Sequence, residues 1–119
     1  MIKRKSSYPI QKNENMRGGD GVVVIEHLLS PDELYDKGQL YAKITIDTGC
    51  SIGYHVHEGE MESFYIVSGE AEVSDNGEIA RISAGDTLLT RSGDGHSIKN
   101  IGAETLEFIA QIIFDGTSS

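Results

Sequence analysis

Apolar and polar residues alternate along much of the chain after residue 38, which is the pattern of half-buried β-strands. The alternation is clearest between Leu40 and Ile46, where every second residue is apolar. Residues 22–25 form a β-branched run, and further apolar runs lie at 64–67, 71–73, 79–82, 87–90, 97–101 and 106–114. Turn signals recur about every 8–12 residues between these runs, as in all-β sandwiches and barrels. We therefore expect an all-β chain without βαβ units.

The strongest turn signal is the dipeptide Asn76-Gly77, which separates residues 71–73 from residues 79–82. A two-residue hairpin turn of this kind needs positive φ at both central positions, and Asn and Gly tolerate it best. The sequence therefore predicts a β-hairpin here.

One short helix is indicated near the N-terminal third of the chain. Ser30 is a candidate N-cap, Pro31 suits the first helical position, and Glu33 completes a capping box with Ser30. We expect this helix to end by Gly38.

The first twenty residues are polar and hold five of the ten Lys and Arg residues. Such a segment is either a disordered, solvated start or an arm that crosses onto a partner subunit. We expect one ordered barrel domain at residues 21–115 and a loose tail at residues 116–119.

The length and net charge of the chain limit the classes of molecule that it is expected to bind. The 119 residues suffice for one domain, and their net charge is −9. A surface this acidic repels phosphate backbones and anionic lipids, so we expect neither nucleic acid nor membrane partners. The chain has no apolar run of membrane-spanning length and no secretory signal at its start. Its single cysteine, Cys50, fits a reducing compartment, and we expect a cytoplasmic protein.

Three histidines and one glutamate are spaced as metal ligands would be. His55 and His57 are two residues apart, so on a strand both imidazoles point to one side. Glu62 follows a glycine-containing turn and starts the next strand, and His96 follows another glycine-rich turn. Three imidazoles and one carboxylate suit a divalent ion of Mn, Fe, Co, Ni or Zn. Four such ligands on a six-coordinate ion leave two positions open, as a catalytic site requires.

Around these residues the chain resembles the cupin superfamily, as a small single-domain protein. The first cupin motif is G(X)5HXH(X)3–4E(X)6G, and every fixed position is present, from Gly49 to Gly69. The second motif is G(X)5PXG(X)2H(X)3N, and residues 85–100 match it except that Arg91 replaces the proline.

The resemblance implies a double-stranded β-helix, or jelly-roll barrel, with the ion inside one mouth. It also implies that His55, His57, Glu62 and His96 bind the metal. Small cupins commonly dimerise by packing or exchanging strands, so we expect a homodimer.

Several residues are candidates for binding a small-molecule substrate. Phe64 and Ile66 share the face of Glu62, and Ile98 shares the face of His96, so they form either an apolar pocket around the ion or plain core. Arg91 is either a cation that anchors a carboxylate or phosphate at the mouth, or a surface residue of a turn. Gln111 is polar within an apolar strand, and is either a hydrogen-bonding group of the pocket or a residue that faces solvent.

No residue can be named as catalytic. Tyr54 and Tyr65 are one and three positions from inward-facing ligands, so both phenols are expected to face away from the ion.

Three functions remain open. The first is a small metalloenzyme acting on an oxygen-rich molecule by dioxygenase- or decarboxylase-like chemistry. The second is a non-catalytic, metal-dependent module that binds or senses a small molecule. The third, also suggested by the resemblance, is an isomerase acting on a sugar or sugar phosphate. Fold and ligand set do not choose among them.

Overall fold

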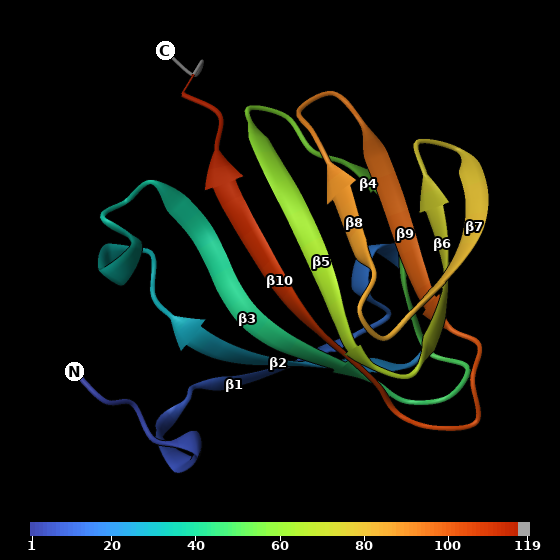
Figure 1. Ribbon diagram of the computed structural model, residues 1–119, viewed down its shortest axis with the longest axis horizontal. Coiled ribbons are helices and arrows are strands. Elements are labelled where there is room, and N and C mark those ends of the chain that lie inside the picture. Colours follow the sequence, from blue (N-terminus) through green and yellow to red (C-terminus); the bar gives the residue numbers. More distant parts are fainter. Residues whose placement is uncertain (117–119) are drawn as a thin grey trace.

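The computed structural model describes residues 1–116, in which ten strands form two antiparallel sheets (Figure 1). The six-stranded sheet has the order β1-β2-β3-β10-β5-β8, and the four-stranded sheet has the order β4-β9-β6-β7. The strands are β1 (Ile10–Glu14), β2 (Val22–Leu29), β3 (Gly38–Ile46), β4 (Ser51–Val56), β5 (Glu60–Ser68), β6 (Glu70–Asp75), β7 (Glu78–Ser83), β8 (Thr87–Thr90), β9 (Gly95–Asn100) and β10 (Leu106–Phe114). Three single turns of 3-10 helix complete the described chain: η1 (Lys5–Ser7), η2 (Met16–Gly18) and η3 (Asp32–Leu34). The expected all-β architecture is confirmed.

The inner faces of the two sheets meet in a single hydrophobic core. Alternate residues of β3 are buried, at Ala42, Ile44 and Ile46, as the sequence pattern predicted. They pack with Phe64 of β5 and Phe108 of β10, whose rings lie 4.6 Å apart. Burial of these apolar faces is the main favourable contribution to folding.

The hairpin predicted at Asn76-Gly77 joins β6 to β7. Asn76 has a φ of 53° and Gly77 a φ of 94°, so both central residues are left-handed. The turn keeps β6 and β7 in register over all six residues of each strand.

The predicted short helix is a single 3-10 turn, η3. The capping box predicted at its start does form. The amide of Ser30 donates to the Glu33 carboxylate at 2.9 Å, and the amide of Glu33 donates to the Ser30 hydroxyl at 3.2 Å. Tyr35 and Asp36 then adopt left-handed φ values of 56° and 55°, which end the helix before a second turn. A capping box therefore fixes where a helix starts and not how far it continues.

The N-terminal segment contributes β1, an edge strand of the six-stranded sheet. β1 pairs with β2 in antiparallel register, from Ile10 opposite Glu26 to Glu14 opposite Val22. All but one residue of β1 is exposed, as expected at a sheet edge. Exchange of this segment with a second copy stays a prediction. Residues 117–119 of the predicted tail lie outside the described residues.

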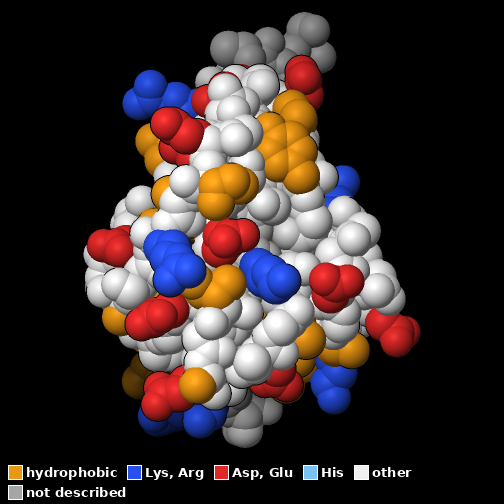
Figure 2. All heavy atoms as spheres, turned by 90° about the vertical axis from the view of Figure 1, so that its right-hand side faces the viewer, with side chains coloured by type: hydrophobic (Ala, Val, Ile, Leu, Met, Phe, Trp, Pro, Cys, Tyr) orange, Lys and Arg blue, Asp and Glu red, His pale blue; other side chains and the backbone are white. Residues whose placement is uncertain are grey.

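The charges are mixed on the face that β6 and β7 border. Figure 2 shows acidic and basic side chains interspersed there, with apolar groups between them. No helix within residues 1–116 has both the length and the apolar character to cross a membrane.

Candidate metal centre

A β-bulge in β4 aims the first histidine into the barrel. Opposite β9, Ile52 pairs with Ile98 and His55 pairs with His96, so a step of three residues on β4 faces a step of two on β9. The extra residue turns both Ile52 and His55 toward the interior, although they are an odd number of residues apart. Tyr54, between them, is left 49% exposed on the outer side.

The other three members of the cluster are buried. His57 lies just beyond the end of β4, Glu62 on β5 and His96 on β9, and they are 4%, 5% and 1% exposed. Phe64 stacks on the His96 ring, with centroids 4.7 Å apart and planes 22° from parallel. The Phe64 ring thus packs against the His96 imidazole from the side of the hydrophobic core.

Four donor atoms from these residues converge on one point. The Nε2 atom of His96 lies 3.1 Å from Nε2 of His55 and 3.2 Å from Nε2 of His57. The carboxylate oxygen Oε1 of Glu62 lies 2.9 Å from His57 Nε2 and 3.0 Å from His96 Nε2. All four donors lie within 4.8 Å of one another.

These separations fit a single transition-metal ion. Donors at right angles around an ion with metal–nitrogen distances of about 2.1 Å would be about 3.0 Å apart. The four measured contacts, between 2.9 and 3.2 Å, agree with that value. Three imidazole nitrogens and one carboxylate oxygen also form the donor set that Mn, Fe, Co, Ni and Zn accept.

Each imidazole is oriented through its other ring nitrogen. Nδ1 of His55 donates to the Gly53 carbonyl at 2.8 Å, and Nδ1 of His57 donates to the Glu60 carboxylate at 2.9 Å. Nδ1 of His96 lies 2.8 Å from the Thr90 hydroxyl, which is fully buried. With Nδ1 engaged in this way, every Nε2 is directed at the common point, where its lone pair would be available to an ion, as in well-supported metal sites.

The electrostatics of the cluster favour an ionised Glu62. Burial alone would raise the pKa of Glu62, but hydrogen bonds from His57 and His96 outweigh it and hold the pKa below the usual value. The hydrogen bond to Glu62 raises the pKa of His57 against the effect of burial, and Glu60 adds to it. Burial lowers the pKa of His55 although the hydrogen bond with the Gly53 carbonyl opposes it, and the nearby charges of His96, His57 and Arg17 lower it further.

The cluster opens into a small cavity of about 70 Å³. Its walls come from the core, from three members of the cluster and from the N-terminal segment: Met16, Arg17, Ile25, Leu40, Ile44, Ile52, His55, His57, Glu62, Phe64 and Ile112. Pockets that enclose drug-sized ligands measure about 300–1,000 Å³. This cavity therefore suits a ligand of only a few non-hydrogen atoms.

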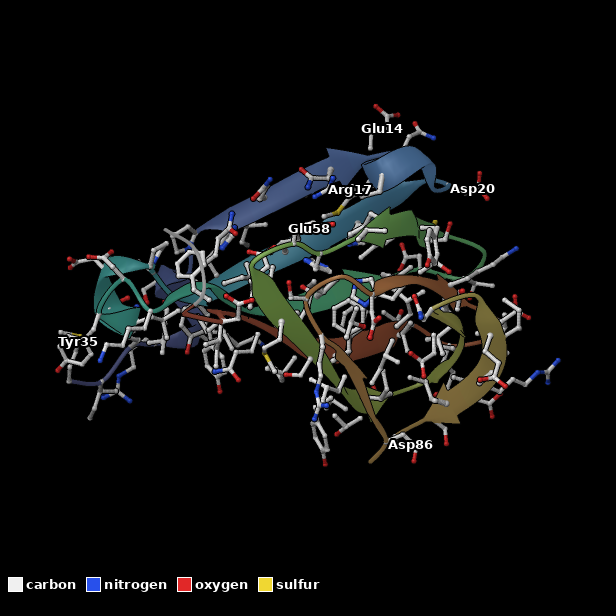
Figure 3. All side chains as sticks on the ribbon, turned by 90° about the horizontal axis from the view of Figure 1, so that it is seen from above. Glu14, Arg17, Asp20, Tyr35, Glu58 and Asp86 are labelled. Carbon is white, nitrogen blue, oxygen red and sulfur yellow. The ribbon has the colours of Figure 1, made fainter. Side chains whose placement is uncertain are left out.

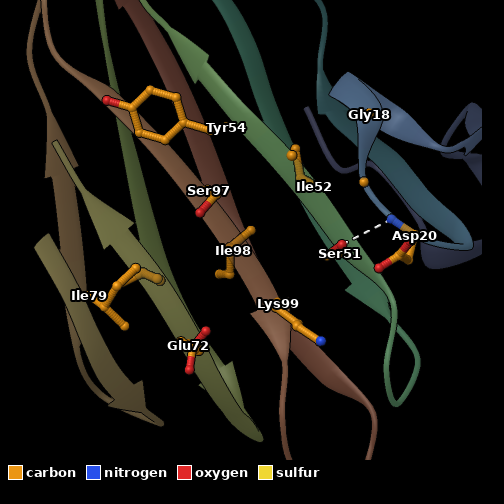
Figure 4. A pocket seen from close by; sticks show the side chains of 13 residues that line it. Gly18, Asp20, Ser51, Ile52, Tyr54, Glu72, Ile79, Ser97, Ile98 and Lys99 are labelled. Atoms are coloured by element: carbon orange, nitrogen blue, oxygen red, sulfur yellow. Dashed lines mark hydrogen bonds between the residues drawn. The ribbon is translucent and has the colours of Figure 1, made fainter. Parts of the chain in front are cut away.

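The N-terminal segment is docked against the bulged strand β4. The amide of Asp20 donates to the Ser51 hydroxyl at 2.9 Å (Figure 4), and the amide of Ser51 donates to the Asp20 carbonyl at 2.9 Å. A side chain at Gly19 would collide with Ser51, and one at Gly53 would collide with the Arg17 carbonyl. Gly19 and Gly53 thus permit direct contact between the backbones of the N-terminal segment and β4, which places η2 at the cavity mouth.

The outer side of this junction forms a wider groove of about 260 Å³. Figure 4 shows it running over the four-stranded sheet past Tyr54, Glu72, Ile79 and Lys99. None of the four cluster residues lines it, so the groove is separate from the candidate centre.

The pocket residues predicted from sequence are placed differently from one another. Phe64 lines the cavity, whereas Ile66 and Ile98 are buried in the core and do not line it. Gln111 lies on β10 opposite Ser63 and Tyr41. Its neighbour Ile112 pairs with Glu62 and lines the cavity, so Gln111 points to the other face of the sheet.

Arg91 is exposed in the turn between β8 and β9 and is not among the residues that line the cavity. The cation that does line it is Arg17 (Figure 3), which sequence reasoning assigned to the arm. Thr90 was also missed, since a buried threonine at the end of a strand carries no sequence signal for its contact with His96. Only the pair of left-handed residues, Asn15 and Arg17, marks η2 as unusual, and φ is not readable from the sequence.

Comparison with known proteins agrees with the fold and with the cluster. The cupin-domain family model matches residues 42–112. The oxalate-binding protein of Thermotoga maritima is 45% identical over 113 residues, which cover 95% of this chain and 93% of that protein.

Solved structures of cupins are also similar to this chain. A crystal structure described as a predicted oxalate decarboxylase from T. maritima superposes with a TM-score of 0.92 and 45% identity, and the match covers 96% of this chain and 99% of that one. The cupin domain of Schizosaccharomyces pombe Cnp3 superposes with a TM-score of 0.72 at 18% identity, covering 88% of this chain and 69% of that one, which reflects shared fold alone. The first motif is complete, the second departs only at Arg91, and the jelly-roll sheets and the His/Glu cluster are in place, so the chain belongs to the cupin family.

Proposed function

We propose that this cupin holds one divalent transition-metal ion at His55, His57, Glu62 and His96 and uses it to bind a small carboxylate, with oxalate as the leading candidate. The observation that carries the proposal is the convergence of four oriented donor atoms at one end of a cavity of about 70 Å³. The names of the two T. maritima relatives support oxalate as the ligand.

The bound ion would supply Lewis acidity and two exchangeable positions for carboxylate oxygens. The chain's own residues prepare the site for it. Gly53, Glu60 and Thr90 hold the three imidazole rings in their ligating orientation. Glu62 contributes a negative charge, and Leu40, Ile44 and Phe64 contribute apolar walls that exclude water from the ligand.

Binding without turnover is the reading that the cavity favours. Apart from cluster residues, the only ionisable group among the described residues that line the cavity is Arg17, which is not a proton donor at neutral pH. Decarboxylation of oxalate requires a proton for the formate that is released. Turnover stays the second candidate because of the description that the T. maritima structure carries. A sugar phosphate is a less suitable ligand, because it is large for a cavity of about 70 Å³.

The test is calorimetry on metal-stripped protein reloaded separately with Mn, Fe, Co, Ni or Zn. We expect one ion per chain, and oxalate binding only after loading. Parallel assays of oxygen uptake, CO2 and formate measure dioxygenase- or decarboxylase-like turnover. Absence of oxalate binding in every loaded form would overturn the proposal. Release of formate and CO2 at a steady rate would replace binding by catalysis.

A further inference from the structure

One cationic residue borders the cavity, and it comes from outside the two cupin motifs. Arg17 of η2 is the only Lys or Arg among the described residues that line the cavity. Within residues 1–116 its guanidinium makes no hydrogen bond or ion pair with another side chain, so its five donors are available to a ligand. Figure 3 shows Arg17 on the N-terminal segment, at η2, which follows β1.

The backbone of Arg17 is fixed while its side chain stays exposed. Its carbonyl packs against Gly53, and the segment is tied to β4 by the two hydrogen bonds between Asp20 and Ser51. Arg17 has a φ of 55°, a left-handed conformation that residues other than glycine adopt only at an energetic cost. A strained backbone at an exposed arginine beside the cavity is compatible with a use for the side chain itself.

Charge balance indicates what that use is. Counting only the ion and the groups that would bind it directly, a divalent ion with the Glu62 carboxylate leaves one net positive charge. A monocarboxylate neutralises that charge, whereas the second negative charge of oxalate needs another cation. Arg17 is placed at the cavity to provide it, and a guanidinium matches two carboxylate oxygens at once.

We propose that Arg17 is the specificity-determining residue that makes the site prefer dicarboxylates of the oxalate class over monocarboxylates. The inference rests on the proposed function and adds a named source of selectivity to it. It also places the anion-binding cation on the N-terminal segment, so the selectivity of the site depends on residues outside the motifs that hold the ion.

The test compares the affinities of oxalate and acetate by calorimetry, with metal-loaded protein in every case. Arg17→Asn and Arg17→Gly remove the charge and keep residues that tolerate a left-handed backbone. Both variants are expected to keep one ion per chain and to lose about 10–100-fold in oxalate affinity, with acetate affinity nearly unchanged. Arg17→Lys is expected to recover part of the preference for oxalate, because lysine restores the positive charge but lacks the paired donors of a guanidinium.

Two further variants separate the possible outcomes. Arg81→Asn removes one positive charge from exposed β7, away from the cavity, and should leave both affinities as in the wild type. Loss of oxalate preference in Arg91→Asn, with the preference kept in Arg17→Asn, would overturn the inference in favour of Arg91. Equal losses of oxalate, acetate and metal in the Arg17 variants would also overturn it. Failure of the loaded wild type to bind oxalate counts against the proposed function instead.

Discussion

The Gly53 carbonyl lies 2.8 Å from Nδ1 of His55, two residues further along the same strand. Gly53 is at the same time the residue against which the Arg17 carbonyl packs. One position in the bulge of β4 therefore orients a candidate metal ligand and seats the N-terminal segment. Disturbing it should affect both.

Gly53→Ala is expected to displace residues 16–20 and to destabilise the fold by about 1–3 kcal/mol, because the new methyl group meets backbone that cannot move aside cheaply. Urea unfolding and hydrogen exchange at residues 16–20 measure the two effects. Gly102→Ala is the matched control, since its nearest neighbours lie 3.6 Å away, at ordinary contact distance. Wild-type exchange at residues 16–20 in Gly53→Ala would contradict the close packing.

Removing a candidate ligand should remove the ion and the stability that it brings. His57→Ala is expected to bind less than one ion per chain and to melt on the order of 10 °C below the loaded wild type, since a ligand at 100 times its Kd adds about 2.7 kcal/mol. Elemental analysis and calorimetric melting test this. The difference between the two proteins should shrink after chelator treatment, because the wild type then loses the same contribution. Full metal content in the variant would refute the assignment.

The contact between Thr90 and His96 predicts a role for a residue that does not touch the ion. Thr90→Val keeps the shape of the side chain and removes the hydroxyl that faces His96 Nδ1. Metal affinity should fall about 10–100-fold, as for other losses of a partner that orients a ligand. Thr87→Val on the exposed side of the same strand should leave metal affinity unchanged. Competition with a chromogenic chelator provides the measurement, and equal affinities in the two variants would disprove the role.

Asn100 ends the second cupin motif and has a structural task. Its side-chain amide donates to the carbonyls of Ile46 and Glu104 at 2.9 and 2.8 Å, and its Oδ1 accepts from the amide of Gly102 at 2.9 Å. Asn100→Ala should lower the free energy of unfolding by about 2–3 kcal/mol, because buried backbone groups lose their partners. Metal stoichiometry should stay at the wild-type level. Denaturant titration and metal analysis together decide between this role and one in the centre.

The attachment of the N-terminus should depend on pH. The Glu33 carboxylate pairs with Lys3 and accepts the amide of Ser30. The contact with Lys3, followed by that with Ser30, lowers the pKa of Glu33 below its ordinary 4.5. Its contribution is therefore complete above 4.5 and is lost as the pH falls through the lowered value. The protection of residues 1–8 against hydrogen exchange, relative to the intrinsic rate at each pH, should fall in acid in the wild type, and should show no such step in Glu33→Gln.

Much of the barrel could be predicted because its inner faces leave a period-two pattern. Residues 87–90 and 106–114 are strands at the predicted bounds, and Asn76-Gly77 forms the predicted turn. β1 could not be found in this way. It is an exposed edge strand, held by hydrogen bonds to β2 rather than by an apolar face, so its residues carry no alternation.

The cluster itself was predictable because its spacing is local and is repeated across a family. The rest of the cavity was not. Arg17 reaches the mouth through a left-handed turn and a glycine contact across the chain, and neither leaves a local pattern. Reasoning from parity also assumed regular strands, whereas β4 contains a bulge that sends Ile52 and His55 to the same side.

That irregularity in β4 has an evolutionary consequence. Loss of the bulge at an unchanged chain length would impose one-to-one pairing with β9 and would reverse the side that the following imidazoles face. The hydrophobic core and most of the strand pairing would remain. A descendant of this chain could therefore lose the convergence of its candidate metal ligands through a substitution that abolishes the bulge, and keep its barrel fold.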